Sequence, residues 1–255
     1  MENSERKSPV PGILLALILG GAFVWATSLL SGAIVRTKSD SEMIRVTGSA
    51  RKNIQSDFII WTGRVSYQGV EVAATYEDLK KGIQKAIDYL KANGVKDEEI
   101  RVNAVRTQTL YASSGQQQGG YYEGETFRQI AGYRLTQSLE VRSSNVAVVE
   151  KVARGSTELI SSGVAFESDA PQFIYTKIGE VKIEILAEAS KDARRRAEEI
   201  AKSAGTTLSD VRFARMAPLQ ITPIYDFGIS SEGQNDTSSN EKAITAIVTM
   251  GFGVK

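Results

Sequence analysis

The chain has 255 residues, of which 31 are basic and 30 are acidic, so its formal net charge at pH 7 is +1. Nucleic-acid binding usually needs an excess of basic groups, and we therefore expect no nucleic-acid partner. The sequence contains neither cysteine nor histidine. This excludes disulfides, thiolate sites, serine triads with a histidine base and histidine metal sites. Carboxylates, lysine, tyrosine and hydroxyls paired with lysine remain as reactive groups.

An apolar segment without charged residues covers positions 10–35. At about 1.5 Å per residue, a helix of this length exceeds the roughly 30 Å of a bilayer's hydrocarbon core. We predict a transmembrane anchor at 10–35, with residues 1–9 as a cytoplasmic tail. The alternative is a cleaved signal peptide ending near Ala33, but the apolar run is longer than the 7 to 15 residues usual for such signals.

Residues 42–255 are expected to form one domain, which begins with two strands and a helix. Strand-favouring residues at 43–53 and 58–67 predict two strands that pair as a hairpin. Helical spacing of apolar residues follows at 70–93 and stops at Asn93-Gly94, a suitable helix terminator.

Two more strands are predicted at 100–111 and 133–141, joined by a long segment rich in glycine, glutamine and tyrosine. The joining segment, 112–128, is either a solvated insertion or a projecting arm. In the second case Tyr111, Tyr121 and Tyr122 would contact another subunit, because tyrosine provides contact area at low entropic cost.

The second half begins with a helix capped by Ser144 and ending at Gly163, then a strand at 164–175 and the longest helix at 177–204. The long helix has small residues at steps of four, including Ala189, Ala193 and Ala197. We expect its backbone to lie close to this domain's own sheet, with a partner helix as the alternative. Strands at 207–216 and 243–254 follow, and the polar stretch 230–241 between them is expected to be mobile.

The predicted order is β-β-α-β-β-α-β-α-β-β. It indicates an α+β fold with a mainly antiparallel sheet and packed helices, preceded by one transmembrane helix.

Several motifs occur in an order that is similar to a known family. They are Ile44-Arg45-Val46-Thr47-Gly48, Gly63-Arg64-Val65, Phe166-Glu167-Ser168-Asp169 and Lys191-Asp192-Ala193-Arg194-Arg195-Arg196-Ala197-Glu198. Over about residues 42–254 the chain resembles the SIMPL-domain family, which includes the bacterial 26 kDa periplasmic immunogenic protein and its oxidative-stress-defence relatives. It departs from the family at Ala50 and Ser56, where glycine and proline are usual.

The resemblance implies an extracytoplasmic α+β protein that forms ring-like or channel-like oligomers, and it brings no accepted catalytic residues. It places the anchor in the inner membrane as a single pass, with the large domain in the periplasm. Because the charges flanking the apolar segment are nearly balanced, they orient it only weakly.

Charged clusters offer two further candidates. Arg194 and Arg195 belong to a helical charge cluster that is either a solvated face, with Arg195 paired to Glu199 and Glu198 to Lys202, or an oligomer contact. Glu167 and Asp169 lie two apart on a strand and so face the same side, but two carboxylates are too few to hold a divalent cation. The glycines from Gly115 lack the Lys-Ser/Thr of a phosphate loop.

We therefore expect a non-enzymatic, membrane-anchored protein that self-associates and supports envelope integrity or oxidative-stress tolerance. No catalytic, cofactor or metal residue is predicted, and the expected partners are further copies of the chain and the membrane. The alternative is a binding module that holds a small molecule or an envelope partner in a groove between helix and sheet. A hydrolase that uses carboxylates or lysine is the third possibility, and nothing in the sequence favours it.

Overall fold

The computed structural model describes residues 43–112 and 129–255. The predicted anchor at 10–35 lies outside them, as does most of the segment between the second pair of strands. Among the described residues, no helix is both long and apolar enough to span a bilayer. The chain divides into two compact units, which we describe separately. Unit 1 holds the residues up to Ala50, Leu186–Ala217 and Ile247–Lys255, and unit 2 holds Arg51–Ile185 and Pro218–Ala246.

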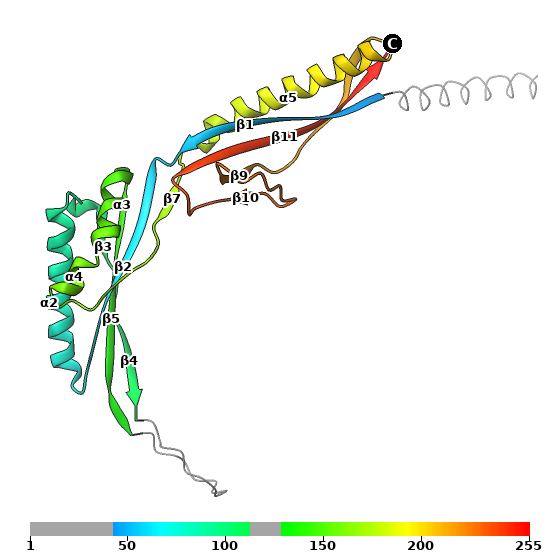
Figure 1. The fold of residues 1–255 in the computed structure, drawn as a ribbon. Helices are drawn as coiled ribbons and strands as arrows, with labels where there is room; N and C mark the ends of the chain where they lie inside the picture. The colour runs from blue at the N-terminus through cyan, green and yellow to red at the C-terminus, as the bar shows by residue number, and fades with distance from the viewer. Residues whose placement is uncertain (1–42, 113–128) are drawn as a thin grey trace, which may run out of the picture. The chain divides into compact units, whose positions relative to one another are not determined.

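Unit 2 is built on a six-stranded sheet in the order β3-β5-β2-β6, with β4 also paired to β5 and β7 to β2 (Figure 1). The strands are β2 (Phe58–Gly69), β3 (Ile100–Val102), β4 (Arg106–Tyr111), β5 (Ile130–Ser143), β6 (Phe166–Ser168) and β7 (Gln172–Ile174). All of these pairs are antiparallel. The longest runs from Ile59 opposite Ser143 to Gly69 opposite Tyr133. The predicted α+β class with mainly antiparallel pairing is confirmed.

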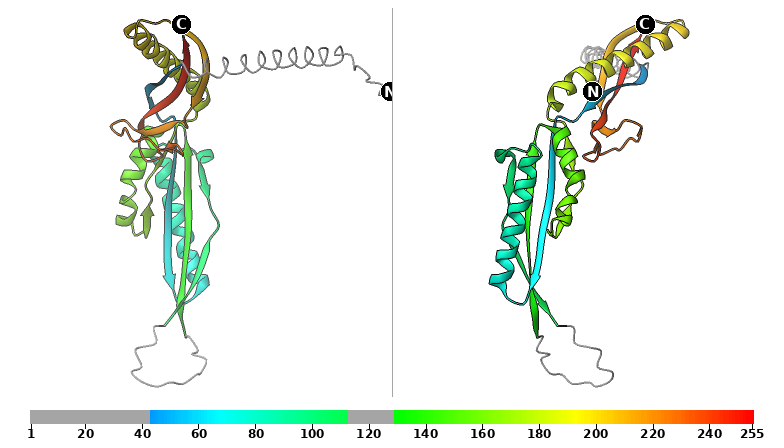
Figure 2. Two further views of the ribbon diagram at one scale, coloured as in Figure 1. Left: turned by 90° about the vertical axis from the view of Figure 1, so that its right-hand side faces the viewer. Right: turned by 60° about the vertical axis from the view of Figure 1, so that its left-hand side comes forward.

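Helices cover one face of this sheet. They are α2 (Val72–Ala92), α3 (Val146–Gly155) and α4 (Glu158–Ser161), with a 3-10 turn, η1 (Asp97–Glu99), after α2. Figure 2 shows α2 running along β2 and β5. Alternate strand residues enter the core, as the period of two requires. The core includes Ile59, Trp61, Val65, Leu79, Ile83, Leu90, Leu135, Leu139, Val141, Val149 and Val152.

Unit 1 has one helix, α5 (Ile178–Ser203), and parts of β1 (Met43–Gln55), β8 (Leu208–Met216) and β11 (Glu241–Val254) among its described residues. Strand β11 pairs antiparallel with β8, from Val248 opposite Met216 to Val254 opposite Leu208, and with β1 on its other side. A small core forms from Val46, Ala193, Ala197 and Phe252. Residues of β1, α5 and β11 also belong to unit 2.

The small-residue stripe of α5 packs on the sheet of its own chain, as predicted. Ala189, Ala193 and Ala197 are fully buried. Opposite them, a Cβ added to Gly48 would lie 2.3 Å from the backbone oxygen of Ala189 and 2.3 Å from the backbone nitrogen of Ala193. Only glycine fits there, because helix and strand meet backbone to backbone.

The predicted hairpin between the first two strands is wrong. Strand β1 pairs with β11, whereas β2 has β5 on one side and β6 and β7 on the other, so the two strands lie in different sheets. Asp57, between them, accepts hydrogen bonds from the backbone N–H and the hydroxyl of Thr176, at 2.7 and 2.8 Å. Long-range hydrogen bonds therefore hold the chain at the point where a hairpin turn was expected.

Three predicted elements are each divided in two. Strand 100–111 is interrupted at Asn103, whose amide bonds to the Ser138 hydroxyl at 3.0 Å. Strand 164–175 breaks around Pro171, which has no N–H to donate to a ladder. Helix 144–163 becomes α3 and α4, and the α3 cap is Asn145, not Ser144, because the Asn145 side chain accepts from the Val148 N–H.

The stretch 230–241, expected to be mobile, is instead fixed by hydrogen bonds. It contains β10 (Gln234–Asn235), which pairs parallel with β9 (Gln220–Pro223), and neither strand was predicted. Lys242 is buried and donates to the carbonyl oxygens of Phe173, at 2.6 Å, and Asp236. Burial lowers the pKa of this ammonium group, and the Asp236 carboxylate opposes the shift. A single buried lysine thus ties the stretch to β7.

Candidate functional surfaces

The sheet of unit 2 has a second face, opposite its helices, that carries polar side chains. We call it the open face. Its residues surround a hollow of about 900 Å³ and come from β2, β4, β5 and β6. They include Thr62, Arg64, Ser66, Gln68, Arg106, Gln108, Arg134, Thr136, Ser138 and Glu167. Polar and apolar residues alternate along β2 because successive side chains point to opposite faces of a sheet.

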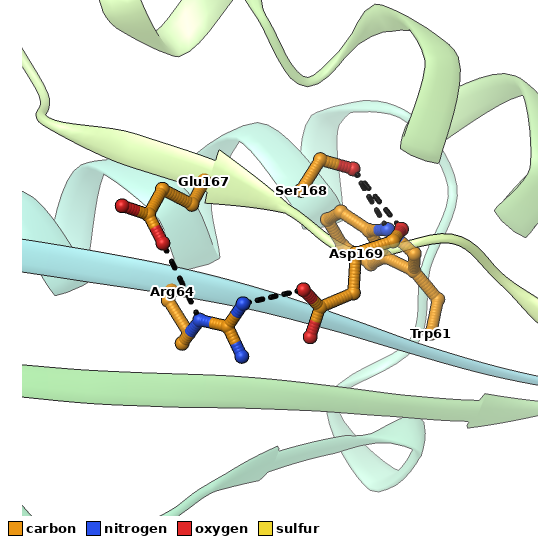
Figure 3. A network of polar contacts seen from close by, with 5 residues as sticks. All are labelled: Trp61, Arg64, Glu167, Ser168 and Asp169. Carbon is orange, nitrogen blue, oxygen red and sulfur yellow. Dashed lines mark hydrogen bonds and ion pairs between the residues drawn. The ribbon is translucent and has the colours of Figure 1, made fainter.

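At one side of the open face, Arg64 binds both predicted carboxylates (Figure 3). Its Nη2 lies 2.5 Å from Asp169 Oδ1, and its Nε lies 3.5 Å from Glu167 Oε2. The two carboxylates face the same side, as their spacing predicted. Their charge is balanced in part by this guanidinium, so the arrangement is an arginine bridge between two acids and not an open cation site.

Next to this bridge, Trp61 connects β2 to β6. The Trp61 indole is buried and donates to the Ser168 hydroxyl at 3.0 Å, as Figure 3 shows. Its ring packs against Phe166 with centroids 6.0 Å apart. Gly63 leaves room for Phe166, because a Cβ there would lie 2.2 Å from the phenylalanine ring. Strand β6, which carries Glu167, is thereby held against β2.

A second feature of unit 2 is an apolar loop after β9, which we define as residues 224–229. Three of its side chains are strongly exposed: Tyr225 at 93%, Phe227 at 73% and Ile229 at 67%. Scattered apolar residues are normal on a protein surface, but three strongly exposed ones within six consecutive positions are a local concentration of apolar side chains. Such a concentration favours an interaction site.

Arg51 holds the apolar loop in place from β1. Its guanidinium donates to the carbonyl oxygens of Asp226, at 3.0 Å, and of Pro223 and Ile224. It also lies over the Phe227 ring, 4.3 Å from the centroid. The Thr222 hydroxyl donates to the same Asp226 carbonyl oxygen at 2.9 Å. Arg51 thus binds the carbonyl oxygens of Ile224 and Asp226, so the first half of the exposed loop is tied to β1.

In unit 1, a groove of about 520 Å³ lies between β1 and α5. It is lined by Val46, Thr47, Arg195, Arg196, Glu199 and Ile200. Ile200 is 47% exposed, and the aliphatic parts of the arginines extend the apolar lining. The groove therefore combines apolar side chains with two guanidinium groups and the Glu199 carboxylate.

Asp192 organises the arginines beside this groove. It accepts hydrogen bonds from the Ser49 backbone N–H at 3.1 Å, from Arg195 at 3.0 Å and from Arg196 at 2.8 Å. The bond from Ser49, with the arginines, holds the pKa of the Asp192 carboxyl below its ordinary value. This carboxylate thus ties α5 to β1 and orients two arginines.

The predicted oligomer contacts fall in different places. Tyr111 ends β4 and is 52% exposed, whereas Tyr121 and Tyr122 lie outside the described residues, so the projecting arm stays a prediction. Arg194 pairs with Glu198 at 2.9 Å, and Arg195 pairs with Asp192. The expected pairs of Arg195 with Glu199 and of Glu198 with Lys202 were wrong. Arg195 pairs instead with Asp192, and Glu198 pairs with Arg194.

Sequence reasoning missed the apolar loop and Arg51. The alternation of Tyr225, Phe227 and Ile229 was a local signal that the surrounding prolines, serines and glycines obscured. Arg51 gave none, since its acceptors lie more than 170 residues away in the chain. Within residues 43–112 and 129–255, no group of three or more acidic side chains is placed to hold a metal ion.

The described residues thus form an α+β protein with a polar sheet face and an exposed apolar loop. A family model described as SIMPL, protein of unknown function (DUF541), matches residues 44–252. The chain belongs to the SIMPL family, as its motifs predicted. A search of the curated proteins finds no match to the sequence.

Proposed function

We propose that this chain is a membrane-tethered, non-enzymatic SIMPL protein whose extracytoplasmic domain works by self-association and supports envelope integrity or oxidative-stress tolerance. The observation that carries the proposal is the apolar loop, whose Tyr225, Phe227 and Ile229 are exposed on a backbone held by Arg51. A fixed apolar patch of this kind favours association, because contact removes it from water. The apolar segment 10–35 supports the tether.

Self-association is tested on the full-length chain in nanodiscs or mild detergent, with particle mass measured over a range of concentrations. We expect assemblies larger than one chain. Tyr225→Ser should weaken association about tenfold or more, because aromatic contacts dominate many interfaces. Val70→Ser is the matched control, since Val70 is 81% exposed in unit 2 but lies outside the loop. A particle mass of one chain at every concentration would contradict the proposal.

The tether and its orientation are tested with single cysteines, which the natural sequence lacks. Ser4→Cys marks the predicted tail and Glu232→Cys marks the exposed surface of unit 2. We expect a membrane-impermeant maleimide to label the Glu232→Cys variant in cells with a permeabilised outer membrane, and the Ser4→Cys variant only after lysis. Labelling in the reverse order would place the domain in the cytoplasm.

A second candidate function is binding of an anionic ligand on the open face. Two guanidinium groups, from Arg106 and Arg134, line the 900 Å³ hollow together with hydroxyl and amide side chains, whereas Arg64 in the same lining is bound to Glu167 and Asp169. Arginine forks bind carboxylates and phosphates in two-pronged fashion. This site differs from the predicted groove between helix and sheet, because it lies on the face that the helices of unit 2 leave free.

Citrate, a tricarboxylate, is a suitable probe for this second function. We expect saturable binding by calorimetry that Arg106→Gln weakens about tenfold. Arg154→Gln should leave binding unchanged, because Arg154 lies on α3 and not on the open face. Equal binding by both variants would show that citrate does not bind to the open face.

A further inference from the structure

We infer that a small cavity in unit 2 binds a short apolar monocarboxylate, whose carboxylate group contacts the Lys242 ammonium. The cavity has a volume of about 150 Å³. Its lining includes four apolar side chains and two polar ones, namely Phe173, Ile174, Ile178, Ile221, Thr237 and Lys242. All six residues belong to unit 2. The inference does not depend on self-association, and the cavity shares no lining residue with the open face or the apolar loop.

Lys242 brings a positive charge to the wall of this cavity, although the residue is only 2% exposed. Its ammonium group has three N–H donors. Two of them bind the carbonyl oxygens of Phe173, at 2.6 Å, and of Asp236. Both acceptors are uncharged, and the described residues provide no third one. A carboxylate in the cavity supplies a third acceptor and the opposite charge together, and such charge-assisted hydrogen bonds are stronger than neutral ones.

The negative charge that the protein itself offers to Lys242 is incomplete. Among the described residues, Asp236 is the one carboxylate that raises the pKa of Lys242, and it makes no ion-pair contact with the ammonium. Its Oδ1 atom accepts from the Ser238 N–H at 2.8 Å and from the Ser238 hydroxyl at 2.6 Å. The pKa of Lys242 is nevertheless lowered, because burial outweighs the attraction to Asp236. The surroundings therefore compensate this buried cation only in part.

The other charged groups next to the lining segments are exposed or already bound. Asp57 is held by a backbone N–H and a hydroxyl, at 2.7 and 2.8 Å. Arg51 binds carbonyl oxygens before and within the apolar loop. Glu241 and Lys177 adjoin lining segments in the sequence, and both are exposed. Within the part of the chain that the structure describes, Lys242 is thus the only charged side chain in the lining.

The size and the walls of the cavity limit the class of ligand. An apolar cavity of about 150 Å³ holds a molecule as large as benzene, so a ligand here has about six or seven non-hydrogen atoms. Phe173, Ile178 and Ile221 offer apolar contact to its hydrocarbon part, whereas Lys242 and Thr237 offer polar contact to its head group. Nucleotides and other large cofactors are excluded by size.

Hydrogen bonds fix the walls of the cavity. The Phe173 N–H donates to the Thr237 carbonyl oxygen at 2.7 Å, and Lys242 donates to the Phe173 carbonyl oxygen at 2.6 Å. The Asp236 N–H donates to the Ile221 carbonyl oxygen at 3.0 Å. The site is therefore formed before a ligand enters, which reduces the cost of binding.

Two small probes test the site on the wild-type chain. Pentanoate has the expected size and charge, and pentanamide is its neutral counterpart of the same shape. Binding is measured by calorimetry on the full-length chain in nanodiscs, with empty nanodiscs as the blank. We expect pentanoate to bind saturably at one site per chain, and pentanamide to bind about tenfold or more weakly because it lacks the charge.

Three variants locate the bound probe. Lys242→Met keeps the length of the side chain and removes its charge, so it should abolish the preference for pentanoate. Ile178→Phe should weaken binding of both probes, because the larger side chain occupies the cavity. Lys177→Met is the matched control and should bind like the wild type, since Lys177 is exposed and outside the lining. Hydrogen exchange over residues 230–241 reports whether Lys242→Met keeps the fold.

Three results would overturn the inference. The first is a lack of saturable pentanoate binding to the wild-type chain. The second is equal affinity of the wild-type chain for both probes, which decides the matter even if Lys242→Met does not fold. The third is pentanoate binding that Ile178→Phe and Lys242→Met leave unchanged, since the probe would then lie elsewhere on the chain. Self-association is read separately from particle mass, so each proposal can fail without the other.

Discussion

The two units cover their sheets with helices of opposite character. In unit 2, α2 places large side chains such as Leu79, Ile83 and Leu90 on the sheet. In unit 1, α5 places Ala189, Ala193 and Ala197 there, and Gly48 of the facing strand lets the two backbones touch. The helix–sheet interface of unit 2 is filled by side chains, whereas in unit 1 the helix and strand backbones are in direct contact.

The two helix–sheet interfaces should therefore be destabilised by opposite kinds of substitution. An interface filled by large side chains is damaged when atoms are removed, because a cavity remains. An interface of backbone contacts is damaged when atoms are added, because nothing can move aside. Two substitutions test this comparison directly, and two more compare a charged contact in each unit. Each is measured on the full-length chain in detergent by denaturant unfolding, with hydrogen exchange to locate the loss.

The largest effect is expected for Leu79→Ala in unit 2. Leu79 is fully buried in the core, so the truncation should lower the free energy of unfolding by about 2–5 kcal/mol. Hydrogen exchange should accelerate first in β2 and β5, which α2 covers. A loss of less than about 1 kcal/mol would mean that the core can close around the missing atoms, and the comparison would fail on this side.

Gly48→Ala should cost about 3 kcal/mol in unit 1, at the upper end of the usual range for overpacking. The added carbon would lie 2.3 Å from backbone atoms of α5, which cannot rotate away. Gly179→Ala is the control, since a Cβ there meets nothing within 4 Å and alanine favours the helix. Equal stability of the two variants would show that α5 shifts freely on β1.

Asp192→Asn should have a smaller effect, and one that depends on pH. The pKa of Asp192 is lowered in the folded state, so its charge stabilises unit 1 above the ordinary aspartate pKa of about 3.9, and this stabilisation is lost as the pH falls through the folded value. The difference in unfolding free energy between wild type and variant should therefore be constant near neutrality and shrink below about pH 4. A difference that does not change with pH would assign Asp192 no electrostatic role.

Arg64→Gln should have the smallest effect on stability, about 0.2–1 kcal/mol, because the Arg64, Glu167 and Asp169 side chains are all more than one-third exposed. The contacts of Trp61 with Ser168 and Phe166, which hold β6, do not depend on this bridge. A loss comparable to that of Leu79→Ala would show that the open face contributes to the stability of the sheet and is not free for ligand.

Much of the fold could be predicted because it is encoded locally. The period of β2 and β5, the stripe of α5 and the glycine at the end of α2 all lie within single elements. The partner of β1 could not be predicted in this way, since β11 is about 200 residues away and nothing in either strand's pattern selects it. The same holds for β9 and β10, which are too short to show a period.

The same limit applies to the candidate surfaces: features within one element could be predicted, and contacts between distant elements could not. The shared direction of Glu167 and Asp169 follows from strand geometry, and the structure confirms it. Their partner Arg64 comes from a different strand, and sequence spacing does not connect them. Arg51 of β1 binds the Ile224 and Asp226 carbonyl oxygens of the apolar loop, and only the folded chain brings these residues together.

The hold of Arg51 on the loop has a thermodynamic consequence. Because Arg51 holds the first half of the loop before any contact forms, binding has to supply less of the roughly 1–2 kcal/mol per residue that fixing a free segment requires. The heat-capacity change on association should then match the apolar area that is covered, without the excess that accompanies coupled folding. A single guanidinium under Phe227 thus preorganises part of the apolar loop for contact.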